Sequence, residues 1–414
     1  MTDRGAHRIG RRSFLRASAL ATPALLAACT RSDRGSRASG SPSPAYEIAA
    51  PSRPVTLPVP SGVAPIDADL ESESDATLDL LTWPNYLWPF VAERFGQDAA
   101  AKVRIQTFGN AETEEIPKLA SGAASPDLAW TTCEALSRLA TAGVLQPLNH
   151  SYIPNLRTNV WPTFRDPYYD RGWRYSVPYA VFTTGIAYRR DHVADAEVAR
   201  KGWAILWDRR YGGRVGFYDD YRDAIGLALL RRGVTDLSTD DPAALKRASV
   251  DLRALREEQG ALASSDGVLT RLAAGKAWLH QSSSGDSIAA QSYLAQDDRP
   301  DVLGFWWPPD HRGPVTNDAI VLPTAADDPV LAHRFVNFLL SNEWAVRNFS
   351  WTGYQPPLRS IDADRLVAGG YIPDTLARAV VREEDLARGL VPTELPAAVD
   401  RLWRRTWIQA TADG

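Results

Sequence analysis

Apolar residues follow two spacings along the chain from Thr77 onward. Short apolar or alternating runs of four to six residues are separated by segments in which apolar residues recur every three or four positions. The runs are typical of strands and the segments of amphipathic helices, so their alternation predicts a mostly parallel sheet with helices on both faces. We expect strands at residues 78–83, 103–108, 127–130, 185–188, 213–217, 277–280 and 318–323, and helices at residues 86–94, 112–120, 134–142, 221–232, 245–258 and 329–340.

These strands form two groups, of which the first ends at Trp130 and the second begins near Gly185. No long linker and no internal repeat separates the groups. A chain of 414 residues is long enough for more than one domain. We therefore expect two α/β lobes, with a chain that crosses between them more than once. In such sheets, ligands bind beyond the carboxyl ends of the strands.

The first 75 residues lack this pattern. Residues 11–16, Arg-Arg-Ser-Phe-Leu-Arg, are similar to the twin-arginine export motif, and residues 26–29, Leu-Ala-Ala-Cys, resemble a lipobox whose cysteine is lipidated. The apolar run at 17–28 is too short to span a bilayer, so residues 1–28 are interpreted as a lipoprotein signal. Residues 29–75 are rich in Ser, Pro, Gly and Ala, and we expect a flexible tether there.

Composition and charge narrow the class of protein. With 44% hydrophobic and 23% charged residues the chain can bury a core, and its longest uninterrupted apolar runs are too short for a membrane span. The formal net charge of −4 becomes −8 without residues 1–28, which argues against a nucleic-acid partner and suits a cationic solute. If Cys29 carries lipid, Cys133 is the only thiol left, and no intrachain disulfide can form.

The sequence contains little that indicates catalysis. The nucleophile elbow, the phosphate-binding loop, the zinc-protease motif and paired C-x-x-C are all absent, and the histidines lack metal-ligand spacing. We expect no enzyme activity, no catalytic residue, no metal and no cofactor. An exported hydrolase that uses a carboxylate pair is the weaker alternative.

Aromatic and acidic residues gather where the predicted strands end. Carboxylates accept charge-assisted hydrogen bonds from ammonium groups, and rings attract cations by about 0.5–2 kcal/mol each, so together they suit a cation with an apolar body. Each residue also has a structural alternative: Asp220 with Asp223 is the pattern of a helix N-cap, and Trp83 alone can be a core residue. The candidate ligand-binding residues are Trp83, Tyr86, Thr132, Glu134, Asp220, Asp223, Asp318 and Tyr354.

Several further segments follow one another in order over residues 77–360. They are Leu80-Leu81-Thr82-Trp83-Pro84-Asn85-Tyr86, Pro126-Asp127-Leu128, Tyr175-Ser176-Val177-Pro178-Tyr179, Gly185-Ile186-Ala187-Tyr188, Asp219-Asp220-Tyr221-Arg222-Asp223, Asn317-Asp318-Ala319-Ile320-Val321-Leu322-Pro323, the helix 335–340 and Gly353-Tyr354-Gln355-Pro356. In this order and with similar spacing, they resemble the spermidine/putrescine-binding proteins of bacterial ABC importers. The resemblance implies the two-lobed, hinged type II fold of periplasmic binding proteins, with lobe 1 at 76–181 and 318–362 and lobe 2 at 182–317 and 363–414.

The resemblance also implies roles for single residues. Trp83, Tyr86 and Tyr354 match ring residues of the family, Thr132 falls at a serine, Asp220 and Asp223 match an acidic pair, and Asp318 matches the carboxylate that receives an amine.

This chain departs from the family pattern at several of these positions. Pro84 replaces a threonine, and Glu134 stands where an aromatic residue is usual. Ser282 and Thr316 fall where the family has the tryptophans that sandwich the polyamine, and whether Trp130, Trp306 or Trp307 restores a ring face stays open.

The function implied is a solute-binding lipoprotein of an ABC importer, which encloses a polyamine or related cationic amine between two lobes and delivers it to the permease. We expect export by the twin-arginine route, a lipid anchor at Cys29 on the outer face of the cytoplasmic membrane, no other membrane contact, and a monomer. The alternative is a receptor of the same fold for iron, thiamine or an opine-like metabolite.

Overall fold

The computed structural model describes residues 46–109 and 114–412. The export motif, Cys29 and the first part of the predicted tether lie outside the described residues. The strands are β1 Thr77–Thr82, β2 Lys102–Thr107, β3 Leu128–Thr132, β4 Ser176–Arg189, β5 Val215–Phe217, β6 Leu262–Ala263, β7 Leu279–Ser283, β8 Leu303–Trp306 and β9 Val315–Val321.

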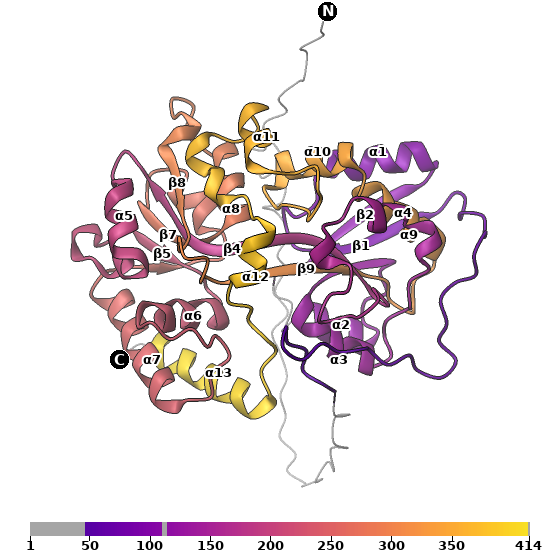
Figure 1. Cartoon of the computed structure of the whole chain (residues 1–414), viewed down its shortest axis with the longest axis horizontal. Helices are drawn as coiled ribbons and strands as arrows, with labels where there is room; N and C mark the ends of the chain where they lie inside the picture. Colours follow the sequence, from indigo (N-terminus) through magenta and orange to yellow (C-terminus); the bar gives the residue numbers. More distant parts are fainter. Residues whose placement is uncertain (1–45, 110–113, 413–414) are drawn as a thin grey trace, which may run out of the picture. The chain divides into compact units, whose positions relative to one another are not determined.

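Helices flank these strands, as the sequence pattern predicts (Figure 1). They are α1 Pro89–Ala99, α2 Ile116–Ser121, α3 Leu136–Thr141, α4 Pro154–Thr158, α5 Asp195–Lys201, α6 Tyr221–Arg231, α7 Pro242–Glu257, α8 Ser284–Ala289, α9 Pro329–Leu339, α10 Asn342–Thr352, α11 Ala363–Ala368, α12 Glu383–Arg388 and α13 Ala397–Thr411, with short 3₁₀ turns between several of them.

The strands lie in the order β2-β1-β3-β9-β4-β7-β5-β6, with β8 also paired to β4. The outer strands β2, β1 and β3 pair in parallel, as do β7, β5 and β6. Every pairing of β4 or β9 is antiparallel, so the sheet is mixed and the predicted parallel order holds for its two outer parts.

One strand, β4, belongs to both lobes. Its first half, residues 176–183, pairs with β9 in the first lobe, and residues 184–189 pair with β7 and β8 in the second. Figure 1 shows β4 and β9 running from one group of strands to the other. The two lobes and their crossovers are therefore confirmed, while the residue boundaries given to the lobes stay a prediction.

Residues 46–75, named the strap here, lie along the first lobe. Val55 and Leu57 are 3% and 2% exposed, and they pack in the core that surrounds α3. The Glu73 carboxylate accepts two backbone N–H groups at the start of α9 (3.1 and 2.8 Å). These contacts correct the prediction of a flexible tether for residues 46–75, because apolar residues are too sparse there to show a pattern but still reach the core.

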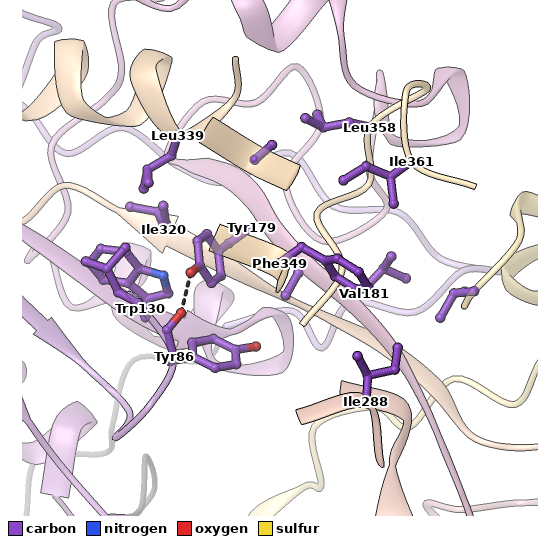
Figure 2. Close-up of a cluster of buried hydrophobic side chains, with 14 of the residues drawn as sticks. Tyr86, Trp130, Tyr179, Val181, Ile288, Ile320, Leu339, Phe349, Leu358 and Ile361 are labelled. Carbon is purple, nitrogen blue, oxygen red and sulfur yellow. Dashed lines mark hydrogen bonds between the residues drawn. The ribbon is translucent and has the colours of Figure 1, made fainter. Parts of the chain in front are cut away.

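The largest core lies around the first half of β4 (Figure 2). Tyr86, Trp130 and Tyr179 pack together there, and the Tyr179 hydroxyl donates a hydrogen bond to the Tyr86 carbonyl oxygen. Ile288 of α8 belongs to the same core, which therefore continues into the second lobe. The loop after β1 is thus held from beneath by buried aromatic residues.

Candidate functional site

The loop after β1 brings aromatic residues to the edge of the first lobe. Trp83 is half-buried, and its ring meets that of Tyr86 edge-on at 5.2 Å between centroids. Tyr354 follows α10 and meets Tyr86 at 4.5 Å, also edge-on. Helix α1 begins only at Pro89, later than expected, because proline is favoured in the first helical position and the preceding residues form this loop.

Asp318 lies beside these rings on β9. The Tyr86 hydroxyl donates to its Oδ2 at 2.5 Å, and β-sheet register places Asp318 opposite Thr132 at the end of β3. Burial raises the pKa of the Asp318 carboxyl to about 8, against the lowering effect of the Tyr86 bond. A carboxyl with this pKa is mostly protonated at neutral pH.

Glu134 lies next to this carboxylate, in the turn between β3 and α3. The Thr316 hydroxyl donates to its Oε1 at 3.4 Å, and Thr316 lies two residues before Asp318 on the same face of β9. Burial raises the pKa of Glu134, while its own backbone N–H and the charge of Arg222 lower it. Thr316 therefore orients a carboxylate at the position where the resemblance implies a ring.

The second lobe supplies Asp220 and Asp223 at the start of α6. The Asp220 carboxylate accepts the N–H groups of Arg222 and Asp223 (2.8 and 3.2 Å), so its predicted capping role is confirmed. Asp223 lies in the first turn of the helix, half-buried, and Gln281 of β7 donates to its carbonyl oxygen at 2.9 Å. Burial and the charge of Asp220 raise the pKa of the Asp223 carboxyl.

Sequence reasoning missed Asp286, which lies in the first turn of α8. Its carboxylate accepts hydrogen bonds from the hydroxyls of Tyr218 (2.7 Å) and Tyr354 (3.0 Å), and burial raises its pKa. Ser283 caps this helix by accepting the Asp286 N–H at 3.0 Å. The pattern Ser-x-x-Asp directly after a strand is the signal that the sequence offered for this position.

Four carboxyl groups of the site act on one another electrostatically. They are named the acidic cluster here and belong to Glu134, Asp223, Asp286 and Asp318. The charge of Glu134 raises the pKa of both Asp318 and Asp223, and that of Asp286 raises the pKa of Asp223. In the part of the chain that the structure describes, no lysine or arginine lies within 4.0 Å of these four carboxylates. The cluster joins acids from both lobes.

The charge of Arg222 reaches this cluster. Its guanidinium donates to the Thr393 carbonyl oxygen at 2.8 Å and lies over the Trp403 ring at 5.2 Å. These contacts hold the guanidinium behind the start of α6. It lowers the pKa values of Glu134 and Asp223 without forming an ion pair with either of them.

The tryptophans considered as substitute ring faces lie elsewhere. Trp130 is fully buried and meets Tyr179 edge-on at 5.4 Å, Trp306 packs edge-on against Trp203 at 5.2 Å, and Trp307 is buried beneath the guanidinium of Arg378. Ser282, also buried, donates to the Ser283 carbonyl oxygen at 2.7 Å. The rings beside the acidic cluster include those of Tyr86, Tyr218 and Tyr354, whose hydroxyls donate to Asp318 and Asp286. Trp83 packs against Tyr86, and Phe182 packs against Tyr354.

The described residues contain no group of three or more His, Cys, Asp or Glu side chains placed to hold a metal ion. Among the helices of the described ranges, none is both long and apolar enough to cross a bilayer.

Comparison with known proteins places this arrangement in a family. The family model described as bacterial extracellular solute-binding protein matches residues 91–369. The putrescine/cadaverine-binding protein of Pseudomonas aeruginosa is 29% identical over 268 residues, which are 64% of this chain and 74% of the relative. The spermidine/putrescine-binding periplasmic protein 1 of Haemophilus influenzae is 26% identical over 300 residues, 72% of this chain and 79% of the relative.

Solved structures show the same fold. The TpPotD lipoprotein of Treponema pallidum superposes with a TM-score of 0.67 at 24% identity, covering 81% of this chain and 99% of that one. The spermidine/putrescine substrate-binding protein PotD of Streptococcus pneumoniae gives a TM-score of 0.63 at 22% identity, covering 81% and 100%. The resemblance to the spermidine/putrescine-binding proteins is thus confirmed, and the chain belongs to the family of bacterial extracellular solute-binding proteins.

Proposed function

We propose that this protein is the receptor of an ABC importer and binds a polyamine or a related cationic amine between its lobes. The observation that carries the proposal is the acidic cluster: four carboxylates from two lobes, electrostatically coupled, beside aromatic rings and without a lysine or arginine at ion-pair distance in the described chain. Grouped buried acids repel one another unless a cation or protons neutralise them. The names of the relatives support an amine as that cation.

Binding would place one ammonium group at Asp318 and Glu134 and another at Asp223 and Asp286. The Tyr86 and Tyr354 hydroxyls donate to Asp318 and Asp286, so they hold the acceptor oxygens in place before the ligand arrives. The tyrosine rings and Trp83 cover the methylenes between the ammonium groups. Thr132 and Asp220 complete the proposed set, next to Asp318 and Asp223 respectively.

Closure of the lobes would follow from contacts of the ligand with both of them. A ligand shifts a hinge equilibrium only by the free energy of the contacts that it makes in the closed form alone. Asp318 and Glu134 come from the first lobe, whereas Asp223 and Asp286 come from the second, so a diamine gains both sets of contacts on closure. β4 pairs with β9 in the first lobe and with β7 in the second, so in this proposal the lobes rotate about these crossing strands. The closed form is then delivered to the permease.

We further infer that the chain is exported by the twin-arginine route, anchored through lipid on Cys29, and acts as a monomer without catalysis. The motif at residues 11–16 and the lipobox at residues 26–29 support this placement. Mass spectrometry of the membrane-bound protein tests it, because the mature chain should begin at a lipid-modified Cys29. A mature chain that begins elsewhere contradicts the anchor.

Calorimetry tests the proposed ligand class. The protein is titrated with putrescine, cadaverine, spermidine and agmatine, with 4-aminobutyrate, thiamine and ferric citrate as comparison solutes. We expect one site per chain and micromolar or tighter affinity for at least one polyamine. Binding of an uncharged or anionic solute, with no heat from any di- or triamine, would overturn the proposal.

A further inference from the structure

Outside the acidic cluster, a polar contact joins the two lobes. Glu394, between α12 and α13, accepts a hydrogen bond from the Tyr46 hydroxyl at 2.6 Å. Its Oε1 also lies 3.5 Å from the Arg138 Nε. Tyr46, Arg138 and Glu394 are named the latch here.

Two members of the latch belong to the first lobe. Arg138 lies in α3, whose Leu136 and Leu139 are fully buried in the first-lobe core. Tyr46 stands at the start of the strap, and Ala49, three residues later, packs against the same core. Both side chains therefore move with the first lobe.

Glu394, in contrast, is fixed to the second lobe by its neighbours. The Thr393 N–H donates to the Ser238 hydroxyl oxygen at 3.1 Å, and its carbonyl oxygen accepts from Arg222 of α6 at 2.8 Å. Leu395 is 6% exposed and packs in the second-lobe core. The latch is thus an ion pair and a hydrogen bond between lobes.

The same elements carry the latch and the ligand-facing acids. Arg138 lies four residues after Glu134, in the helix that continues from the turn of Glu134. On the other side, Thr393 holds Arg222, which directly precedes Asp223. A change in the distance between α3 and residues 393–394 therefore changes the distance between Glu134 and Asp223.

The side chains of the latch are also less exposed to solvent than those of a surface ion pair in the same protein. The Glu394 side chain is 10% exposed and that of Arg138 is 32% exposed, whereas both partners of the Arg94–Asp98 pair in α1 are nearly half exposed. Partly buried charge-assisted bonds contribute more than surface pairs, whose contribution is close to zero.

We propose that Glu394 is a positioning residue for ligand capture: through Arg138 and Tyr46 it holds the lobes together, so that Glu134 and Asp223 stay within reach of the two ammonium groups of one amine. The inference rests on the proposed function, because it assigns the latch a role in retaining the ligand. Loss of the latch lowers the closed population and so speeds ligand release.

The test compares Glu394→Gln, Arg138→Gln and the double variant with the wild type in the full chain. Stopped-flow measurement of putrescine or spermidine release should show about a fivefold faster rate for each single variant, with little change in association rate. The double variant should release the amine about as fast as Glu394→Gln alone, because the Arg138 change then removes no further contact with Glu394. Arg94→Gln, which breaks a pair inside one lobe, is the matched control and should leave the release rate unchanged.

Hydrogen exchange of the ligand-free protein gives a second readout that needs no amine. Glu394→Gln should speed exchange in α3 and in residues 390–395 together, while Arg94→Gln should affect neither segment. The inference is overturned if both segments of Glu394→Gln exchange as they do in the wild type. It is also overturned if the amine dissociates from the latch variants at the same rate as from the wild type. A wild-type chain that binds no amine contradicts the proposed function instead, and the exchange result still decides on the latch.

Discussion

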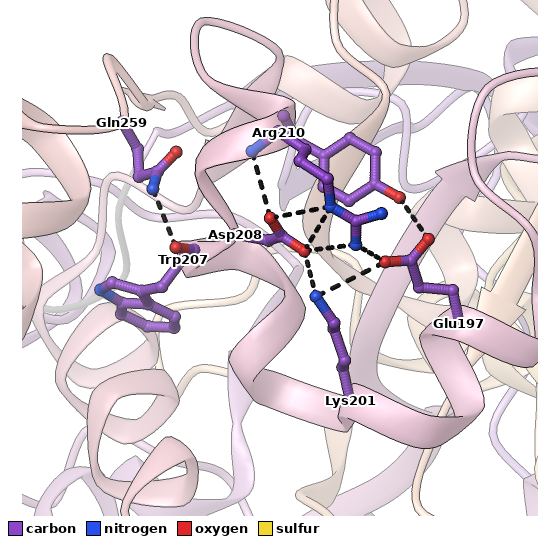
Figure 3. Close-up of polar contacts among 7 residues, drawn as sticks. Glu197, Lys201, Trp207, Asp208, Arg210 and Gln259 are labelled. Atoms are coloured by element: carbon purple, nitrogen blue, oxygen red, sulfur yellow. Dashed lines mark hydrogen bonds and ion pairs between the residues drawn. The ribbon is translucent and has the colours of Figure 1, made fainter.

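Two clusters of charged side chains in this protein differ in whether their carboxylates have cationic partners. In the first, named the paired cluster here, acidic and basic side chains alternate in α5 and in the turns that follow it. Its members are Glu197, Lys201, Asp208 and Arg210 (Figure 3). Arg210 lies 2.6 Å from Asp208, and Lys201 3.5 Å from Glu197. Although burial raises the pKa of Asp208, the bonds from Lys201 and from the Arg210 backbone N–H lower it below the ordinary value. In the acidic cluster, by contrast, each carboxyl has a raised pKa.

The difference shows where the fold needs a ligand to balance its charge. The paired cluster contains its own counterions and fixes the 3₁₀ turns before β5 without outside help. The carboxylates of the acidic cluster are more deeply buried, and the described residues around them offer hydroxyls and rings in place of counterions at ion-pair distance. Its balancing charge must therefore come from protons or from a bound cation.

Neutralising one acid in each cluster tests whether only the acidic cluster binds the amine, and it should give the largest effect. Asp318→Asn should weaken amine binding about a hundredfold or more, since truncating one partner of a buried charge pair costs about 2–5 kcal/mol. Asp208→Asn is the matched control and should leave affinity within about twofold. Calorimetry with the amine that binds the wild type most tightly measures both. Equal losses in the two variants would contradict a ligand site at the acidic cluster.

The pH dependence of amine binding should show that the acidic cluster is protonated before the ligand binds. Because burial raises the pKa of Asp318 to about 8 in the free protein, an ammonium group must displace a proton below that pH. Affinity should therefore rise with pH between about 6 and 8, by up to about tenfold per unit for one released proton, and level off above. Titrations in buffers of different ionisation enthalpy count the protons released. In Asp318→Asn the slope should fall, and a pH-independent wild type would contradict the prediction.

The smallest expected effect is a difference in sign between the clusters. Asp223 has a raised pKa, so the folded form holds its proton more tightly than the unfolded chain does. Stability therefore falls as the pH rises from the pKa of the unfolded chain to that of the folded form. Asp208 has a lowered pKa, so it stabilises the fold above its unfolded pKa and that contribution is lost in acid. At pH 8 without ligand, Asp223→Asn should thus stabilise the fold and Asp208→Asn destabilise it, each by about 1 kcal/mol. Denaturant unfolding measures both, and shifts of the same sign would contradict the comparison.

Much of the fold could be predicted from local pattern. Helix α9 and strands β1 and β5 lie where apolar spacing places them. β4 was predicted at only four residues, although it spans 14, because it is buried on both faces and shows no alternation. The strap escaped prediction for a related reason, since two apolar residues such as Val55 and Leu57 carry no periodicity.

The part of the site that lies on or just after predicted strands could be predicted from local pattern as well. Asp220, Asp318 and the rings of Trp83 and Tyr86 follow or lie on strands, where the sequence pattern points. Asp286 was missed because its neighbours Ser282, Ser283 and Ser284 have the composition of a loop, whereas strand β7 and helix α8 meet there. Coupling between Glu134 and Asp223 depends on how the lobes meet, which local pattern does not encode.

The start of the strap also limits how far the folded body can lie from a membrane. Sixteen residues lie between Cys29 and Tyr46, where the latch joins the chain to the folded body. Fully extended, the chain from Cys29 to Tyr46 spans about 60 Å. If Cys29 is lipidated as proposed, Tyr46 stays within that distance of the membrane surface, so solute capture and docking on a permease take place in a layer whose depth is set by this length and by the size of the folded body.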